Sequence, residues 1–229
     1  MSPGPLVDLA CVPRWLAGLV ASTEGLRAEA FTRFVPPASS ESRKAAVLML
    51  FGEQEEAGPD VLLLRRADTL TAHPGQVAFP GGSADADDDG PVATALREAE
   101  EEVGVLAGGV LPVALLPELY VPGSGYLVTP VLAYWTEPMA VRPVDPAETS
   151  AVARVPVSRL TDPTHRFRVR HPSGYVGPAF SVPGMLVWGF TAGLLSGLLS
   201  LAGWERPWDR GDVRDLDSAL WAANMEVSR

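Results

Sequence analysis

The chain has 229 residues, of which 47% are hydrophobic and 20% charged, so it is neither intrinsically disordered nor collagen-like. Its 18 basic and 28 acidic residues give a net charge of −10, which argues against nucleic-acid binding through a broad basic face. Because Cys11 is the only cysteine and residues 1–15 lack the pattern of a signal peptide, we expect no intrachain disulfide, no cysteine-based zinc site and a cytoplasmic location.

The hydrophobic pattern predicts helices at both ends of the chain and strands between them. Residues 1–34 are expected to be mostly helical, with a break at Pro13. Three strand pairs are expected: 45–51 with 61–64, 111–121 with 126–135, and a hairpin within 166–180 that turns at 172–174. A short helix is expected over 216–225. This order predicts an α/β fold with a mixed sheet between helical layers.

Residues 180–204 contain no Asp, Glu, Lys or Arg and are long enough to span a bilayer. The alternative is a buried helix that begins at Pro183 and Gly184 and runs to Ala202, with one apolar face and one face of small residues. We expect the buried helix, because an isolated membrane span fits poorly with the chemistry of the preceding segments.

The segment 73–105 carries the candidate chemistry. A helix is predicted from Pro91 to Gly104, which suit its first position and its end. At 100° per residue, Glu98, Glu101 and Glu102 lie on one face of that helix. Their mutual repulsion calls for a positive charge among them, and oxygen ligands without His or Cys suit Mg²⁺ or Mn²⁺. The alternative is an acidic helix face in plain solvent, but two glycines (81–82) just before it would let backbone approach a ligand closely.

The run REAEEEVGV (97–105) resembles the second half of the Nudix box, Arg-Glu-x-x-Glu-Glu-x-Gly followed by an apolar residue. The first half departs from the box, because Gly82 is followed after five residues by Asp88 rather than Glu, and Arg97 comes one residue later. That extra residue is similar to the coenzyme A pyrophosphatase branch of the family. The resemblance implies a Nudix-type α/β/α sandwich with a mixed sheet.

The residues before the box resemble the leader of the same branch. The matching positions are Leu62, Leu63, Arg66, Ala67, Gly75, Phe79, Pro80, Gly81 and Gly82. Thr71 stands where the branch usually has a second arginine, which keeps a different Nudix substrate open. Arg66, His73 and Gln76 are candidate substrate contacts, and a loop histidine bound only to backbone is the alternative for His73.

The resemblance implies hydrolysis of the pyrophosphate bond of coenzyme A or its thioesters to 3′,5′-ADP and (acyl-)4′-phosphopantetheine. It implies Mg²⁺ or Mn²⁺ on Glu98, Glu101 and Glu102, with the carbonyl of Gly82 as a further ligand. By the same resemblance Arg97 orients the glutamates.

The general base would be a glutamate inside the box, such as Glu101, or one outside it. Glu148 resembles a branch position for the latter, with a solvated loop acid as its alternative. Arg43 and Lys44 either meet a 3′-phosphate or lie on a surface strand.

Three other functions stay open: a Nudix hydrolase of ADP-ribose, a dinucleotide or a dNTP; a non-catalytic binding module; and a membrane-anchored enzyme. We expect a small nucleotide substrate, no nucleic-acid partner and no membrane, and the terminal helices offer packing surface for a homodimer. The predicted organisation is a single Nudix domain over 1–229, with a helical extension (1–39), a core (40–204) and a helical tail (205–229).

Overall fold

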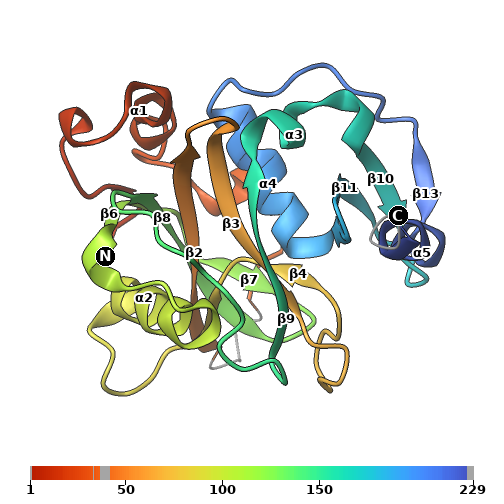
Figure 1. Ribbon diagram of the computed structural model, residues 1–229, viewed down its shortest axis with the longest axis horizontal. Coiled ribbons are helices and arrows are strands. Elements are labelled where there is room, and N and C mark those ends of the chain that lie inside the picture. The colour runs from red at the N-terminus through yellow and green to blue at the C-terminus, as the bar shows by residue number, and fades with distance from the viewer. Residues whose placement is uncertain (1, 33, 37–41, 226–229) are drawn as a thin grey trace.

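A large mixed sheet forms the centre of the molecule in the computed structural model, which describes residues 2–32, 34–36 and 42–225 (Figure 1). Its strands are Gly4–Pro5 (β1), Arg43–Gln54 (β2), Gly58–Arg66 (β3), Val77–Ala78 (β4), Gly81–Ser83 (β5), Val110–Leu115 (β6), Leu119–Val121 (β7), Tyr126–Trp135 (β8) and Thr149–Pro156 (β9). They run in the order β1-β6-β8-β2-β3-β4, with β5 on β2, β7 on β8 and β9 on β3. β2 and β8 are parallel, whereas β2 and β3 are antiparallel, so the predicted mixed sheet is confirmed.

Helices cover both faces of this sheet because its central strands are apolar on both sides. On β2, Ala46, Leu48 and Leu50 pack with the helix Gly90–Val103 (α2). Met49 and Phe51 point the other way, into a core shared with the helices Arg14–Ala21 (α1) and Gly189–Leu201 (α4). The alternation is the period of two that a strand imposes on its side chains. The predicted α/β/α sandwich is therefore confirmed.

A second, four-stranded sheet lies beside the first, in the right-hand part of Figure 1. Its strands are Arg166–Arg170 (β10), Val176–Val182 (β11), Met185–Val187 (β12) and Val213–Asp215 (β13), in the order β12-β11-β10-β13. The helix Leu216–Met225 (α5) packs on it, and the helix Val157–Thr161 (α3) precedes it. The hairpin within 166–180 and the helix at 216–225 are confirmed, whereas β12 and β13 were not predicted.

The predicted helix start at Pro183 is wrong. Pro183 and Gly184 form the turn between β11 and β12, and Gly184 has a φ of 72°, which glycine adopts readily. The helix begins only at Gly189 and has 13 residues. Across the described ranges, none of the helices has the length and apolar character that a bilayer crossing requires.

The prediction for residues 1–34 is confirmed only in part. Pro13 is the N-cap of α1, so the expected break is there, but α1 spans only eight residues. The segment also contributes β1, which pairs with β6, and two short 3-10 turns, Leu9–Cys11 and Ala28–Ala30. Further 3-10 turns are Ala107–Gly109 and Pro163–His165. The expected boundary between residues 39 and 40 lies outside the described residues, so the division into extension, core and tail stays a prediction.

Candidate active site

The predicted acidic helix is α2, with a proline in its first turn and a glycine at its end. Gly104 ends it in the left-handed conformation with a φ of 74°, and its N–H donates to the carbonyl of Glu100 at 3.0 Å. Pro91 stands in its first turn, where a missing N–H costs nothing. Ala95, Ala99 and Val103 are buried against the sheet, and Glu98 and Glu102 lie on the adjoining face of the helix.

Arg97 is the centre of a polar network at the start of the site. Its Nε and Nη2 donate to the two oxygens of Asp88 at 3.0 and 2.9 Å, a bidentate pair. Nη2 also donates to the carbonyl of Ser83, and Nη1 donates to Glu98 and Glu101 at 3.0 and 3.1 Å. This network holds the pKa of Asp88 well below its usual range and raises the pKa of Arg97. Arg97 therefore fastens the loop before α2 to the helix and fixes two of its glutamates.

Glu98 and Glu102 reach the strand β5 beneath the helix. A Cβ on Gly82 would lie 2.5 Å from the carboxyl group of Glu98, so only glycine leaves room for that carboxyl group. Glu102 accepts a hydrogen bond from the N–H of Gly81 at 2.9 Å. Burial raises the pKa of Glu98, and it raises the pKa of Glu102 to about 7, with the charge of Glu98 adding to the effect. Two carboxyl groups thus lie partly desolvated beside the two glycines of β5.

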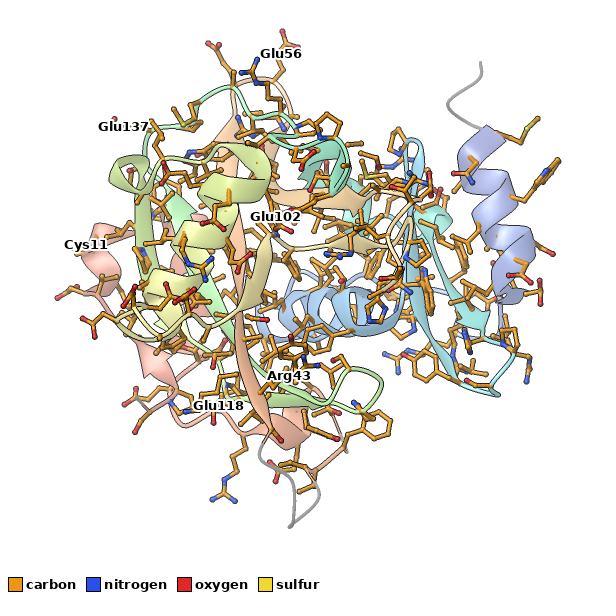
Figure 2. The ribbon with its side chains drawn as sticks, turned by 90° about the horizontal axis from the view of Figure 1, so that it is seen from below. Cys11, Arg43, Glu56, Glu102, Glu118 and Glu137 are labelled. Atoms are coloured by element: carbon orange, nitrogen blue, oxygen red, sulfur yellow. The ribbon has the colours of Figure 1, made fainter. Side chains whose placement is uncertain are left out.

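These groups line a cavity of about 820 Å³. The cavity brings together seven of the nine predicted site residues: Arg66, His73, Gln76, Gly82, Glu98, Glu102 and Glu148. Figure 2 shows Glu102 on the side of α2 that faces the middle of the molecule, whereas Glu56 and Glu137 lie at its periphery. Arg66 and Glu148, which are 82 positions apart in the sequence, share one cavity because β3 pairs with β9, where Arg66 lies opposite Thr149.

The other two predicted residues, Arg97 and Glu101, are absent from the cavity wall. Glu101 has 59% of its side chain exposed and pairs with Arg97. Its role as a metal ligand or base stays a prediction. Thr71 is exposed and also lies outside the cavity wall.

The residues of the cavity suit a hard divalent cation. In the described part of the chain, no three His, Cys, Asp or Glu side chains are grouped closely enough to hold a metal ion. Mg²⁺, however, is often bound by only one or two carboxylates, with water and substrate phosphates filling the remaining positions. Glu98, Glu102 and the carbonyl of Gly82 offer such a set of oxygens, and the raised pKa of Glu102 reflects a carboxyl group whose burial is not offset by the positive charge near it.

The far wall of the cavity consists of residues that the sequence did not single out. Trp188, Phe190 and Thr191 come from the start of α4, and Tyr126 and Val128 come from β8. The aromatic pair that flanks Gly189, which the structure leaves half-buried, was the available signal, but the expected helix start at Pro183 placed it inside a buried helix. Arg43 also lines this cavity, whereas Lys44 does not.

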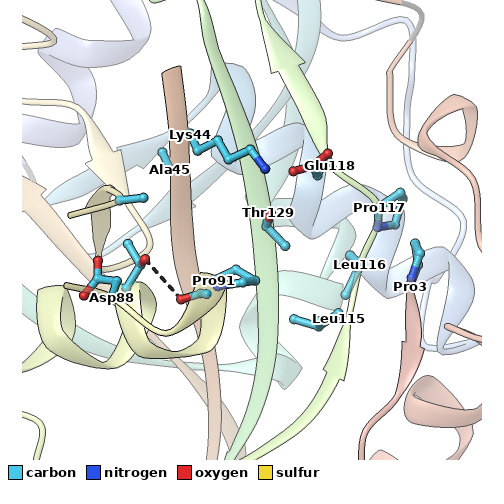
Figure 3. A pocket seen from close by; sticks show the side chains of 13 residues that line it. Pro3, Lys44, Ala45, Asp88, Pro91, Leu115, Leu116, Pro117, Glu118 and Thr129 are labelled. Atoms are coloured by element: carbon cyan, nitrogen blue, oxygen red, sulfur yellow. Dashed lines mark hydrogen bonds between the residues drawn. The ribbon is translucent and has the colours of Figure 1, made fainter. Parts of the chain in front are cut away.

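Lys44 faces a second pocket of about 450 Å³ on the other side of β2. Figure 3 shows its side chain extending toward Glu118. The rim also includes Asp88 and Pro91, and the Thr94 hydroxyl donates to the carbonyl of Gly90 at 3.3 Å. Successive side chains of a strand point to opposite faces, which separates Arg43 from Lys44.

Comparison with known proteins points to the family that the acidic helix and its preceding loop resemble. A model of the NUDIX domain matches residues 41–174. The uncharacterized Nudix hydrolases NudL of Yersinia pestis (strain Pestoides F) and of Yersinia pseudotuberculosis (serotype O:1b, strain IP 31758) are each 51% identical over 94 residues, 41% of this chain. The match spans 46% of each relative, about half its length. The crystal structure of the Nudix hydrolase RenU from M. smegmatis superposes with a TM-score of 0.51 at 21% identity, covering 74% of this chain and 91% of RenU, and supports the fold alone.

Proposed function

This chain belongs to the Nudix family, and on that premise we propose that it is a metal-dependent hydrolase of the pyrophosphate bond of coenzyme A or its thioesters. The products are 3′,5′-ADP and 4′-phosphopantetheine or its acyl form. A cytoplasmic location and a homodimer stay predictions.

One observation carries this proposal. Three residues of the leader, Arg66, His73 and Gln76, line the same cavity as Gly82, Glu98 and Glu102 of the box. The leader is the part of the sequence that resembles the coenzyme A branch, so its presence at the acidic wall supports a substrate of that class. The cavity is also large enough for more than a diphosphate, since drug-sized ligands occupy pockets of about 300–1,000 Å³.

In the proposed mechanism, Glu98, Glu102 and the carbonyl of Gly82 would hold Mg²⁺ or Mn²⁺. Such an ion would supply charge neutralisation for the phosphate oxygens and would lower the pKa of a bound water. Arg66 lies near enough to Glu102 to lower its pKa, so its guanidinium stands beside the place where the diphosphate charge would lie. Arg97 acts indirectly, because it binds the carboxylates of Asp88, Glu98 and Glu101 and does not itself line the cavity.

We propose Glu148 as the general base. Its backbone is fixed, because its carbonyl accepts from the N–H of Ala67 at 2.8 Å, while its side chain borders the cavity and is exposed to water. An exposed carboxylate can take a proton from an attacking water and release it to solvent. Glu101 is the second candidate, and its contact with Arg97 suggests a positioning role.

A different Nudix substrate, such as ADP-ribose, a dinucleotide or a dNTP, is the second candidate function. The observation that favours it is Thr71, which stands in place of the expected arginine and does not line the cavity.

The decisive experiment is incubation of the purified chain with Mg²⁺ or Mn²⁺ and a panel of these substrates, with the products resolved by chromatography. We expect 3′,5′-ADP from coenzyme A. Turnover of ADP-ribose or a dNTP without 3′,5′-ADP from coenzyme A would select the second candidate, and no turnover with no metal binding would favour a binding module.

Matched variants separate the roles of the glutamates. Glu102→Gln should lower kcat roughly 10³-fold, because several kcal/mol of charge stabilisation depend on the ion. Glu101→Gln, which loses a contact to Arg97, should lower kcat only about 10-fold. Equal losses in the two variants would instead support direct metal binding by Glu101.

A further inference from the structure

The cavity has a second cationic end, formed by Arg43 at the start of β2. Its guanidinium lies over the ring of Tyr126, with Cζ 4.2 Å from the ring centroid, and its Nη2 donates to the carbonyl of Ser124 at 3.2 Å. Both contacts orient the planar group in the cavity mouth. In the view of Figure 2, Arg43 and Glu102 lie well apart from each other.

The register of the sheet gives the separation between Arg43 and the acidic wall. Ala46 pairs with Gly82, and Arg43 lies three residues before Ala46 on the same strand, so the two positions are about 10 Å apart at the strand rise. Tyr126 also links Arg43 to this wall. Its ring contacts the guanidinium of Arg43, and its hydroxyl lies 2.8 Å from Oγ of Ser83, the residue after Gly82. The arginine side chain spans part of this backbone separation, so its guanidinium can meet a group on the ribose next to a diphosphate at Gly82.

The charges that line the cavity determine how it would receive a second phosphate of the substrate. Glu98, Glu102 and Glu148 make the wall acidic, so a substrate with an additional phosphate would be repelled unless a positive group meets that phosphate. Arg66 stands at the Glu102 end. Arg43 is the arginine at the other end, and a guanidinium binds phosphate with two parallel hydrogen bonds.

We propose that Arg43 is a specificity-determining residue that binds a second phosphate, carried on the ribose of the nucleotide whose diphosphate lies at Gly82, Glu98 and Glu102. The inference rests on the proposed function, because coenzyme A carries such a phosphate at the 3′ position. It assigns to Arg43 the discrimination between nucleotides with and without that group, and it leaves Lys44 out, because Lys44 faces the other pocket.

The first test compares kcat/KM for coenzyme A and 3′-dephospho-coenzyme A in the wild type, Arg43→Gln, Arg43→Lys and the control Lys44→Gln. We expect the wild type and Lys44→Gln to prefer coenzyme A by about 10- to 100-fold, the range of a charge-assisted contact. Arg43→Gln should reduce this ratio to near one, mainly through KM, and Arg43→Lys should restore part of it. An unchanged ratio in Arg43→Gln would overturn the proposal.

The second test measures binding without turnover, so that the two proposals can fail separately. Calorimetric titration of the full chain with 3′,5′-ADP and with 5′-AMP, in the presence of Mg²⁺, compares two ligands that differ only in the 3′-phosphate. We expect tighter binding of 3′,5′-ADP that disappears in Arg43→Gln and persists in Lys44→Gln. Equal affinities in the wild type would overturn the role of Arg43, whereas failure to hydrolyse coenzyme A with this preference intact would overturn only the proposed reaction.

Discussion

At the scale of single residues, the site is a balance between one arginine and several carboxyl groups. Arg97 binds Asp88, Glu98 and Glu101, whereas Glu102 has only the N–H of Gly81 as its hydrogen-bond donor among the described residues. The carboxyl group nearest the sheet is therefore the one whose charge is least compensated. This is why burial raises its pKa to about 7.

The raised pKa of Glu102 predicts a pH dependence of stability without metal. In the unfolded chain this carboxyl titrates near its ordinary value of about 4.3, so the folded chain binds the proton more tightly. The contribution of Glu102 to the free energy of unfolding therefore falls as pH rises from about 4 to about 7 and is level above that. Between pH 5 and pH 8 the wild type should lose about 2 kcal/mol relative to Glu102→Gln.

Urea unfolding of both proteins in EDTA measures this difference directly. Saturating Mg²⁺ should flatten the wild-type curve, because the ion stabilises the charged carboxylate. Parallel curves for the two proteins in EDTA would contradict the raised pKa.

At the scale of elements, the closeness of β5 to its neighbours determines the site. A Cβ on Gly81 would meet the backbone of β2, with the Cα of Val47 at 2.6 Å, while a Cβ on Gly82 would meet only the movable carboxyl group of Glu98. Gly81 is therefore needed for the pairing of β5 with β2, whereas Gly82 is needed for the position of the Glu98 carboxyl group.

Alanine substitutions should separate these two roles. Gly81→Ala should lower the free energy of unfolding by about 2 kcal/mol, because the backbone must shift. Gly82→Ala should leave stability nearly unchanged but reduce kcat, because Glu98 must move. The control is Gly18→Ala on α1, where a Cβ has open space and should stabilise the helix by about 0.5–1 kcal/mol. Equal stability of all three variants in urea would contradict this reading.

The elements also show how far the sequence could predict the structure. α2 was predicted well, because Pro91, Gly104 and the buried alanines are local signals that agree with one another. The helix at 183–202 was placed too early, because apolar residues such as Leu186 and Val187 fit a buried strand as well as a helix. The cavity wall at Trp188 and Phe190 depends on that boundary and on a distant sheet, so local pattern could not predict it.

At the scale of the whole molecule, Arg166 joins the second sheet to the rest. Its side chain is 1% exposed, Nη2 lies 2.7 Å from Oγ of Ser196 on α4 and 2.9 Å from Glu205, and its guanidinium faces the ring of Trp208. Strand β10, helix α4 and the segment that follows α4 meet at this one group. No periodic pattern marks such a contact, so it could not be predicted from the sequence.

Removing the partner of Arg166 should destabilise the whole molecule. Glu205→Ala leaves a buried cation unpaired and should cost about 3 kcal/mol. The matched control is Asp212→Ala, which removes the partner of Arg214 in an exposed pair and should cost less than about 1 kcal/mol. Thermal unfolding of the two variants tests this, and equal midpoints would show that Arg166 finds compensation elsewhere.

The position of the aromatic wall has a consequence for how such an enzyme can diversify. The acidic helix and its glycine turn lie within residues 41–174, the part that matches the NUDIX model, whereas Trp188, Phe190 and Thr191 lie after it. The residues proposed to hold the metal ion and this aromatic part of the cavity wall are thus encoded in separate stretches of the gene. Substitutions after residue 174 can therefore alter the aromatic wall of the cavity, and with it the range of substrates, while the acidic residues of α2 stay the same.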